Sequence, residues 1–239
     1  MTTNADATEV LLFDVFGTVV DWRTSLDKWF QRFGRNHNLE ADWLGLVDDW
    51  RAAYAPSMAR VRQGERSYVT LDVLHRESLD PLLVQYGLGS TSESDRRQMA
   101  RAWRWLDHWP DTIAGLTRLK RKYVIGTLSN GGLGLLVDMA KHAELPWDAV
   151  LSADLFQRYK PDPAVYLGAA DLLARPTSAL MLVAAHNYDL AAARSHGFRT
   201  AFVARPTEYG PRQKKDFGPE EAWDFAASSL EELAEKMGA

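Results

Sequence analysis

Residues 10–21, with the sequence VLLFDVFGTVVD, decide how the rest of this 239-residue chain is interpreted. An apolar run of strand length ends at Asp14, and Gly17 and Thr18 follow at once. This pattern is typical of a buried parallel strand that brings a carboxylate to its carboxyl end, where open α/β sheets bind ligands. Gly17 permits a tight turn there, and Thr18 places a hydroxyl beside Asp14. Asp14 is therefore a candidate covalent nucleophile; the plainer alternative is an aspartate that only caps the next turn.

The composition is that of an ordinary globular protein, with 46% hydrophobic and 25% charged residues. A net charge of −4 gives no electrostatic reason to expect nucleic acid or an anionic membrane as a partner. The absence of cysteine excludes disulfides, thiolate metal sites and a cysteine nucleophile. The first residues are polar and acidic, unlike a signal peptide, and no apolar run approaches membrane-spanning length. We therefore expect a soluble, cytoplasmic protein with no nucleic-acid or membrane partner.

Residues 25–109 have the periodicity of helices. Leu26, Trp29, Phe30 and Phe33 recur at helical spacing, and seven of the nine tryptophans lie in residues 22–109. Aromatic stripes of this kind usually form a core, so the segment is predicted to be a separately packed helical module. Pro110 breaks the last helix and marks the return to the rest of the protein.

After residue 110, apolar strands alternate with helices, which predicts a parallel sheet covered by helices on both faces. Four loops are expected at the carboxyl ends of strands: residues 14–18, residues 129–130, the loop with Lys160, and residues 186–189. In a doubly wound sheet such loops converge on one crevice. Each has a plainer explanation, since residues 129–130 could only turn a loop, Lys160 could be solvated and Asp189 could cap a helix. The same ordered set at successive strand ends favours a shared site.

The order Asp-x-Phe-Gly-Thr, Leu-Ser-Asn-Gly, Lys-Pro-Asp-Pro and a late aspartate resembles the haloacid dehalogenase superfamily of hydrolases. The resemblance covers nearly the whole chain. It implies an α/β fold with a Rossmann-like core domain in residues 1–22 and 110–239, built on a parallel sheet flanked by helices. The resemblance also implies an all-helical cap domain, residues 23–109, inserted after the first strand.

The residue two positions after Asp14 separates two branches of this superfamily. Most members resemble magnesium-dependent phosphatases, which carry a general-acid aspartate there, whereas this chain has Phe16. Ala184 and Ala185 stand where the phosphatase pattern has an acidic ligand for Mg²⁺. Without a metal, a phosphoryl dianion beside Asp14 would meet like-charge repulsion. The 2-haloacid dehalogenases resemble this chain in having an aromatic residue at the position of Phe16. Halide leaves as a stable anion and needs no general acid, so we expect neither a metal nor a cofactor.

We therefore predict metal-independent hydrolysis of short-chain 2-haloalkanoic acids, including haloacetates and 2-halopropionates, to 2-hydroxy acids by an enzyme of the (S)-2-haloacid dehalogenase type. The resemblance implies that Asp14 attacks C2, releases halide and forms an aspartyl ester, which water then hydrolyses. The expected partners are the small haloacid and the halide ion, and family analogy alone makes a homodimer a possible assembly. Two alternatives remain open: a phosphatase of a small phosphate ester, and a non-catalytic member that only binds an acid.

The resemblance also implies a substrate-binding set. Arg51 matches the cap arginine that receives the departing halide, and Asn130 would assist on the halide side. Ser129, together with nearby backbone amides, would bind the substrate carboxylate. Phe16 and Tyr166 complete this set, although Tyr166 is nearly as well explained as a helix aromatic that packs on the sheet.

Three further residues are expected to serve the nucleophile. Thr18 and Lys160 would position Asp14 and keep it ionised, because a nearby cation favours the carboxylate. Asp189 would orient or activate the hydrolytic water.

His186 departs from the usual dehalogenase pattern. Many relatives carry a serine and an asparagine where this chain has Ala184 and His186. We hypothesise that His186 occupies the place of the asparagine near the water or the halide, because it lies three residues before Asp189. Its bulkier ring would narrow the pocket toward haloacetates, including fluoroacetate.

Overall fold

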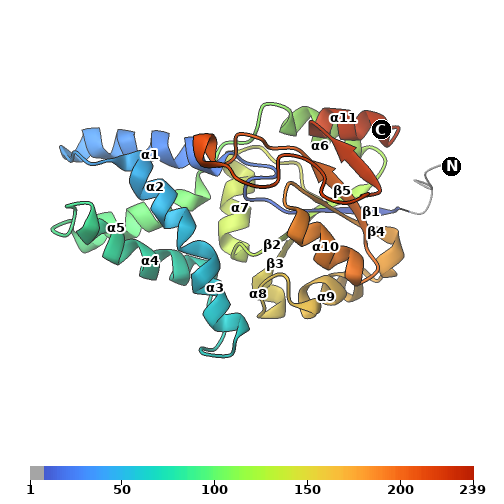
Figure 1. Cartoon of the computed structure of the whole chain (residues 1–239), viewed down its shortest axis with the longest axis horizontal. Helices are drawn as coiled ribbons and strands as arrows, with labels where there is room; N and C mark the ends of the chain where they lie inside the picture. Colours follow the sequence, from blue (N-terminus) through green and yellow to red (C-terminus); the bar gives the residue numbers. More distant parts are fainter. Residues whose placement is uncertain (1–7) are drawn as a thin grey trace.

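A computed structural model describes residues 8–239 of the chain. Six strands form one sheet in the order β3-β2-β1-β4-β5-β6 (Figure 1), and all neighbours pair in parallel. The strands are β1 (Val10–Phe13), β2 (Val124–Ser129), β3 (Ala149–Ser152), β4 (Leu180–Ala184), β5 (Arg199–Val203) and β6 (Phe225–Ala227). The predicted α/β class is confirmed. Because β1 lies between β2 and β4, Asp14 emerges at the centre of the carboxyl edge of the sheet.

Helices cover both faces of the sheet. Alternate residues of β1 point to opposite faces, so Leu11 and Phe13 belong to one apolar core and Leu12 to the other. The first core includes buried residues of α6 (Thr112–Lys120), α7 (Leu133–His142) and α11 (Leu230–Lys236). The second core includes those of α9 (Pro163–Leu173) and α10 (Asn187–Ser195). The short elements α8 (Ala153–Phe156), η3 (Thr177–Ala179) and η4 (Gly210–Arg212) lie in the connections between these strands and helices.

The segment between β1 and α6 folds into helices that lie together at one side of the sheet (Figure 1). They are α1 (Trp22–His37), α2 (Trp43–Ala52), α3 (Tyr54–Arg62), α4 (Leu71–Gln85), α5 (Glu93–Ala100) and η2 (Arg101–Arg104). Asp21 caps α1 by accepting a hydrogen bond from the Thr24 N–H, and Phe30, Trp50 and Trp103 are buried between the helices, as their spacing predicts. We propose that residues 23–109 are the cap domain expected from the sequence.

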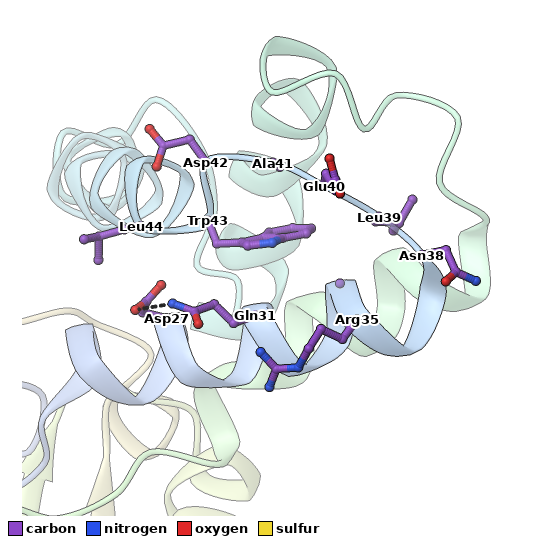
Figure 2. Close-up of a pocket in the computed structure, with 11 residues that line it drawn as sticks. Asp27, Gln31, Arg35, Asn38, Leu39, Glu40, Ala41, Asp42, Trp43 and Leu44 are labelled. Atoms are coloured by element: carbon purple, nitrogen blue, oxygen red, sulfur yellow. Dashed lines mark hydrogen bonds between the residues drawn. The ribbon is translucent and has the colours of Figure 1, made fainter.

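A large surface hollow lies on this helical region and outside the site predicted from the sequence. It has a volume of about 770 Å³ and lies between the end of α1 and the start of α2 (Figure 2). Its lining includes Asp27, Gln31, Arg35, Asn38 and Trp43, and none of the predicted site residues.

Of the helices within residues 8–239, none is both long enough and apolar enough to cross a membrane.

Candidate active site

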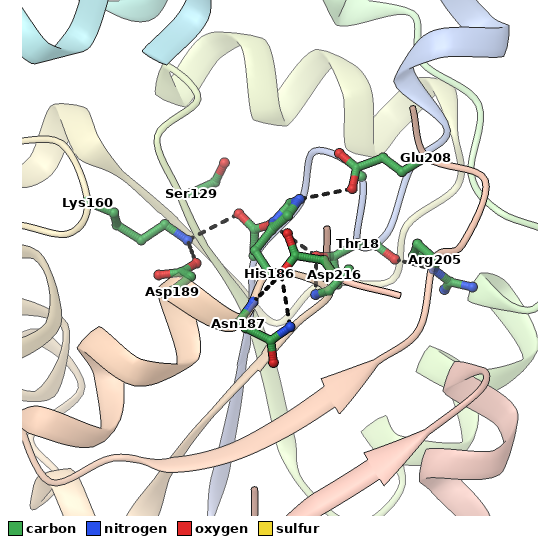
Figure 3. Close-up of polar contacts among 12 residues, drawn as sticks. Thr18, Ser129, Lys160, His186, Asn187, Asp189, Arg205, Glu208 and Asp216 are labelled. Atoms are coloured by element: carbon green, nitrogen blue, oxygen red, sulfur yellow. Dashed lines mark hydrogen bonds and ion pairs between the residues drawn. The ribbon is translucent and has the colours of Figure 1, made fainter. Parts of the chain in front are cut away.

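The predicted loops meet at the carboxyl edge of the sheet, where Figure 3 shows Thr18, Ser129, Lys160, His186 and Asp189 together. The chain leaves β1 after Phe13, and the Asp14 N–H still donates to the Val183 carbonyl at 3.0 Å, which fixes the backbone at this point. Gly17 has a φ of +85°, so a residue without a β-carbon is needed for the turn that follows, as predicted. The Asp14 side chain is only 11% exposed. It is therefore a carboxylate held inside the protein, where its neighbours determine its chemistry.

The two carboxylate oxygens of Asp14 have different partners. Oδ1 accepts a hydrogen bond from Lys160 Nζ at 3.1 Å. Oδ2 accepts one from the Thr18 hydroxyl at 3.0 Å and lies 3.0 Å from His186 Nδ1. Burial alone would raise the pKa of Asp14, but the Lys160 ammonium and the His186 ring hold it well below its ordinary value. Asp14 is thus ionised at neutral pH, as a nucleophile must be.

Asp189 lies on the opposite side of the Lys160 ammonium. Lys160 Nζ donates to Asp189 Oδ2, and the Tyr166 hydroxyl donates to Asp189 Oδ1 at 2.6 Å. Burial raises the pKa of Asp189 above its ordinary value, against the lowering effect of Lys160. Burial would lower the pKa of Lys160, but the two carboxylates raise it, so its side chain is a cation between them at neutral pH. Tyr166 therefore contacts the site through Asp189, in addition to packing on the sheet.

His186 joins Asp14 to a carboxylate that the sequence did not predict. Its Nδ1 atom faces Asp14, and its Nε2 atom lies 3.0 Å from Glu208 Oε2 (Figure 3). Burial alone would lower the pKa of His186, but the charge of Glu208 and the hydrogen bonds to both carboxylates raise it to about 10. Burial likewise would raise the pKa of Glu208, and the His186 ring lowers it. The imidazole is accordingly a cation at neutral pH.

Glu208 reaches this position because Gly17 has no side chain. A β-carbon on Gly17 would overlap with Glu208 Oε1. Trp22 Nε1 donates to the same oxygen at 3.0 Å, and Arg51 Nη2 lies 3.9 Å from it. The glycine of the Asp-x-Phe-Gly-Thr stretch is therefore needed for two reasons, the turn itself and the close approach of Glu208.

Ser129 and Asn130 connect the end of β2 to the rest of the site. The Asn130 side-chain oxygen accepts a 2.7 Å hydrogen bond from the Lys160 backbone N–H, which positions the lysine loop. The Ser129 hydroxyl accepts a 3.1 Å hydrogen bond from the Gly131 N–H and is fully buried. Both residues lie in the predicted site, and Asn130 has an additional role in the backbone that carries Lys160.

Arg51 enters from α2 and is surrounded by aromatic rings. Its guanidinium carbon lies 4.4 Å from the centre of the Tyr54 ring, 5.4 Å from that of Trp22 and 5.8 Å from that of Tyr209. Its Nη2 atom also donates to the Tyr209 hydroxyl at 3.3 Å. Contacts of this kind hold a guanidinium at a fixed position in a partly apolar pocket. Burial would lower the pKa of Arg51, but the neighbouring tyrosines and Glu208 raise it.

Phe16 forms part of the apolar wall between Asp14 and the helical region. Its ring centre lies 5.7 Å from that of Trp103 and 6.3 Å from that of Tyr54, both in edge-on contacts, and its side chain is buried. The position that carries a general acid in the phosphatase pattern therefore holds an apolar ring in an aromatic cluster.

Sequence reasoning missed four residues that complete this site: Trp22, Tyr54, Glu208 and Tyr209. Glu208 and Tyr209 lie in the connection after β5, which the sequence presents only as a polar loop. The signal that could have found them is the one used for the other loops, since β5 also ends at the carboxyl edge of the sheet.

The fold and site define the class of the protein. A family model described as haloacid dehalogenase-like hydrolase matches residues 8–197, and the chain belongs to this family, as the sequence motifs predict. Two solved L-2-haloacid dehalogenase structures are similar over 97% of the chain, each with a TM-score of 0.94. One, described as defluorinating, is 45% identical and matched over 96% of its own length; the other is 48% identical and matched over 99%.

More distant relatives carry the same description. The L-2-haloacid dehalogenase of Xanthobacter autotrophicus is 25% identical, with a TM-score of 0.79 over 97% of this chain and 99% of that one. The (S)-2-haloacid dehalogenase 4A of Burkholderia cepacia is 28% identical over 96% of this chain and 99% of its own length.

Proposed function

We propose that the chain is an (S)-2-haloacid dehalogenase-type enzyme that hydrolyses short-chain 2-haloalkanoic acids to 2-hydroxy acids without a metal. The observation that carries the proposal is the pairing of an ionised, buried Asp14 with an apolar Phe16 two positions later. A phosphate ester would need a proton donor for its leaving alkoxide, whereas halide leaves as a stable anion. The surroundings of Asp14 also suit Mg²⁺ poorly, because Lys160, Thr18 and His186 already contact its two oxygens.

The first step is displacement of halide at C2 of the substrate. Asp14 Oδ1 has fewer neighbours than Oδ2, and we assign it as the attacking atom. The new bond joins Oδ1 to C2, and the carbon–halogen bond breaks with its electron pair on the halide. Arg51, fixed by its aromatic neighbours, and Asn130 receive the anion, while Ser129 and nearby backbone amides bind the substrate carboxylate.

The second step is hydrolysis of the aspartyl ester. Asp189 takes a proton from water as the water oxygen attacks the carboxyl carbon of Asp14. The bond between Asp14 Cγ and Oδ1 then breaks, while the bond between Oδ1 and C2 stays. The hydroxyl oxygen of the product is therefore the former Oδ1. Lys160 Nζ contacts both Oδ1 of Asp14 and Asp189, which allows it to protonate the leaving alkoxide and recover the proton from Asp189. The second water proton dissociates from Asp14, whose carboxylate is restored with one oxygen from water.

The size of the expected substrate follows from burial. Asp14, Lys160, Asp189 and His186 are all buried, and aromatic rings close the side of the site near Arg51. Such a site suits an acid of two or three carbons better than a longer one, in keeping with haloacetates and 2-halopropionates as substrates.

The direct test is halide release in EDTA from chloroacetate, fluoroacetate and the two enantiomers of 2-chloropropionate. We expect chloride from chloroacetate and the (S)-enantiomer, and none from Asp14→Asn. A parallel assay measures phosphate release from a generic phosphate ester with added Mg²⁺. Phosphate release without halide release would replace the proposal with the phosphatase alternative. Binding of haloacid without either product would support the non-catalytic one.

A further inference from the structure

His186 is placed between two carboxylates, and each of its ring nitrogens faces one of them. Nδ1 lies 3.0 Å from Asp14 Oδ2, and Nε2 lies 3.0 Å from Glu208 Oε2. A neutral imidazole would direct one unprotonated nitrogen at a carboxylate oxygen, which is repulsive in a side chain only 4% exposed. The imidazolium instead donates an N–H to each carboxylate.

Thr18 directs a second donor at the same oxygen of Asp14. Its hydroxyl accepts a 2.9 Å hydrogen bond from the Ala185 N–H and donates to Asp14 Oδ2 at 3.0 Å. Oδ2 therefore receives two hydrogen bonds, one of them from a cation. Oδ1, by contrast, has the Lys160 ammonium as its partner.

We propose that the His186 imidazolium and the Thr18 hydroxyl form an oxyanion hole on Asp14 Oδ2, and that Glu208 is the positioning residue that holds the imidazolium there. This inference rests on the proposed aspartyl ester. Once Oδ1 is alkylated, Oδ2 is the carbonyl oxygen of the ester. When water adds to the carbonyl carbon, the π electron pair moves onto Oδ2, where the two donors already point.

The remaining atoms of this step are accounted for by the other groups. Asp189 accepts one water proton, and collapse of the tetrahedral intermediate returns the electron pair from Oδ2 and expels Oδ1 as an alkoxide. Lys160 protonates that alkoxide. His186 donates hydrogen bonds throughout and is not itself consumed, since a ring with two N–H groups has no lone pair with which to act as the base for water.

This assignment differs from a role in binding the halide or narrowing the pocket. Both N–H groups of His186 are already directed at Asp14 and Glu208, so neither is available to a departing halide. The titratable and charged groups that face His186 come from several elements: the carboxylates Asp14 after β1 and Glu208 after β5, the neutral Tyr188 ring on α10, and Arg51 on α2 through Glu208.

Rapid quenching with excess chloroacetate separates the two steps. We expect His186→Leu, which removes both ring N–H donors, and Thr18→Val to release about one equivalent of chloride per site at near the wild-type rate. Turnover then falls by roughly 10²–10³-fold, and the carboxymethyl ester accumulates on Asp14 in the mass spectrum. Thr18→Ser, which keeps the hydroxyl, should recover most of the turnover that Thr18→Val loses, and His142→Leu, a surface change, should behave as wild type.

The contrary result would be that, in the His186 and Thr18 variants, the rate of the chloride burst falls by the same factor as turnover and no ester accumulates on Asp14. That outcome would place His186 in the displacement step and overturn the inference while leaving the proposed function intact. A wild-type protein that releases no chloride and forms no ester would overturn both.

Glu208→Gln provides a second test that does not remove the imidazole. Loss of the carboxylate lowers the pKa of His186, so ester hydrolysis should approach the wild-type rate at pH 6 and decline as the pH rises through the lowered pKa. The wild-type rate should persist until the pH nears the His186 pKa of about 10. A histidine that acts as general base predicts the reverse, with the Glu208→Gln rate rising with pH, and that result would overturn the inference.

Discussion

The ammonium of Lys160 lies 3.1 Å from Oδ1 of Asp14, although 146 positions separate the two residues in the chain. Its second contact, with Asp189, places one buried cation between two buried carboxylates. Removal of this cation would leave Asp189 without a cationic partner and Asp14 with only the His186 imidazolium.

We therefore predict that Lys160→Met reduces turnover by at least about 10²-fold and destabilises the fold by roughly 3–5 kcal/mol at pH 7. The pKa of Asp14 should rise, which would move the acid limb of the pH–rate profile to higher pH. Urea unfolding and a pH–rate series measure the two effects. Equal stability of Lys160→Met and wild type at pH 7 would contradict the assigned charges.

Arg51→Lys tests the assignment of the halide side. Lysine keeps the charge but loses the planar contact with Tyr54 and the hydrogen bond to Tyr209. We expect the rate of the chloride burst to fall by roughly 10-fold or more, with no accumulation of ester, because displacement is slowed and hydrolysis is not. A normal burst followed by slow turnover would instead place Arg51 in the hydrolysis step.

Tyr166→Phe tests the link between α9 and the proposed base. The hydroxyl donates to Asp189 Oδ1 at 2.6 Å, and its removal leaves that oxygen without this donor. We predict a loss of roughly 3–10-fold in turnover and a further rise in the pKa of Asp189, seen as a shift of the acid limb to higher pH. Unchanged turnover and an unchanged profile would assign Tyr166 to packing alone.

Because His75 is buried in its neutral form, we predict that the folded protein loses stability in acid. His75 is buried against Trp103 at a ring-centre distance of 4.5 Å, and burial, with the charge of Arg51, lowers its pKa from 6.5 to about 3. The unfolded chain therefore binds a proton between these values that the folded protein does not, so stability decreases as the pH falls from 6.5 toward 3.

His75→Phe keeps a ring against Trp103 but has no group to protonate. As the pH falls from 6.5 toward 3, its free energy of unfolding should therefore decrease less than that of wild type, by on the order of a few kcal/mol. Urea unfolding of both proteins at pH 6.5 and pH 4 compares the changes. Identical losses in the two proteins would show that His75 does not carry this effect.

Four residues of the candidate site could be located from the sequence by a single rule. Polar residues in the loops that follow parallel strands meet at one edge of the sheet. Asp14, Ser129, Asn130 and Asp189 obey it, because each follows an apolar run whose burial is evident from the residues alone. Lys160 required the family motif as well, since only the folded loop, held by Asn130, turns its side chain toward Asp14.

Glu208 was not predicted because it lies in a polar segment without a motif, although it stands as far beyond the end of β5 as Asp189 stands beyond the end of β4. Its role depends on the packing of that loop over Gly17 and on the position of Trp22. For the same reason the sequence left His186 without a partner on its second nitrogen, and its charge state followed only from the assembled fold.

The proposed ester makes the oxygen atoms of Asp14 exchange with solvent during turnover. The most direct measurement is mass spectrometry of the peptide that contains Asp14 after repeated turnover of chloroacetate in ¹⁸O-labelled water. We predict ¹⁸O in the Asp14 carboxylate and, after a single turnover, an unlabelled hydroxyl oxygen in the product. Label in the product of the first turnover, with none in Asp14, would mean that water attacks the substrate directly and would contradict the account.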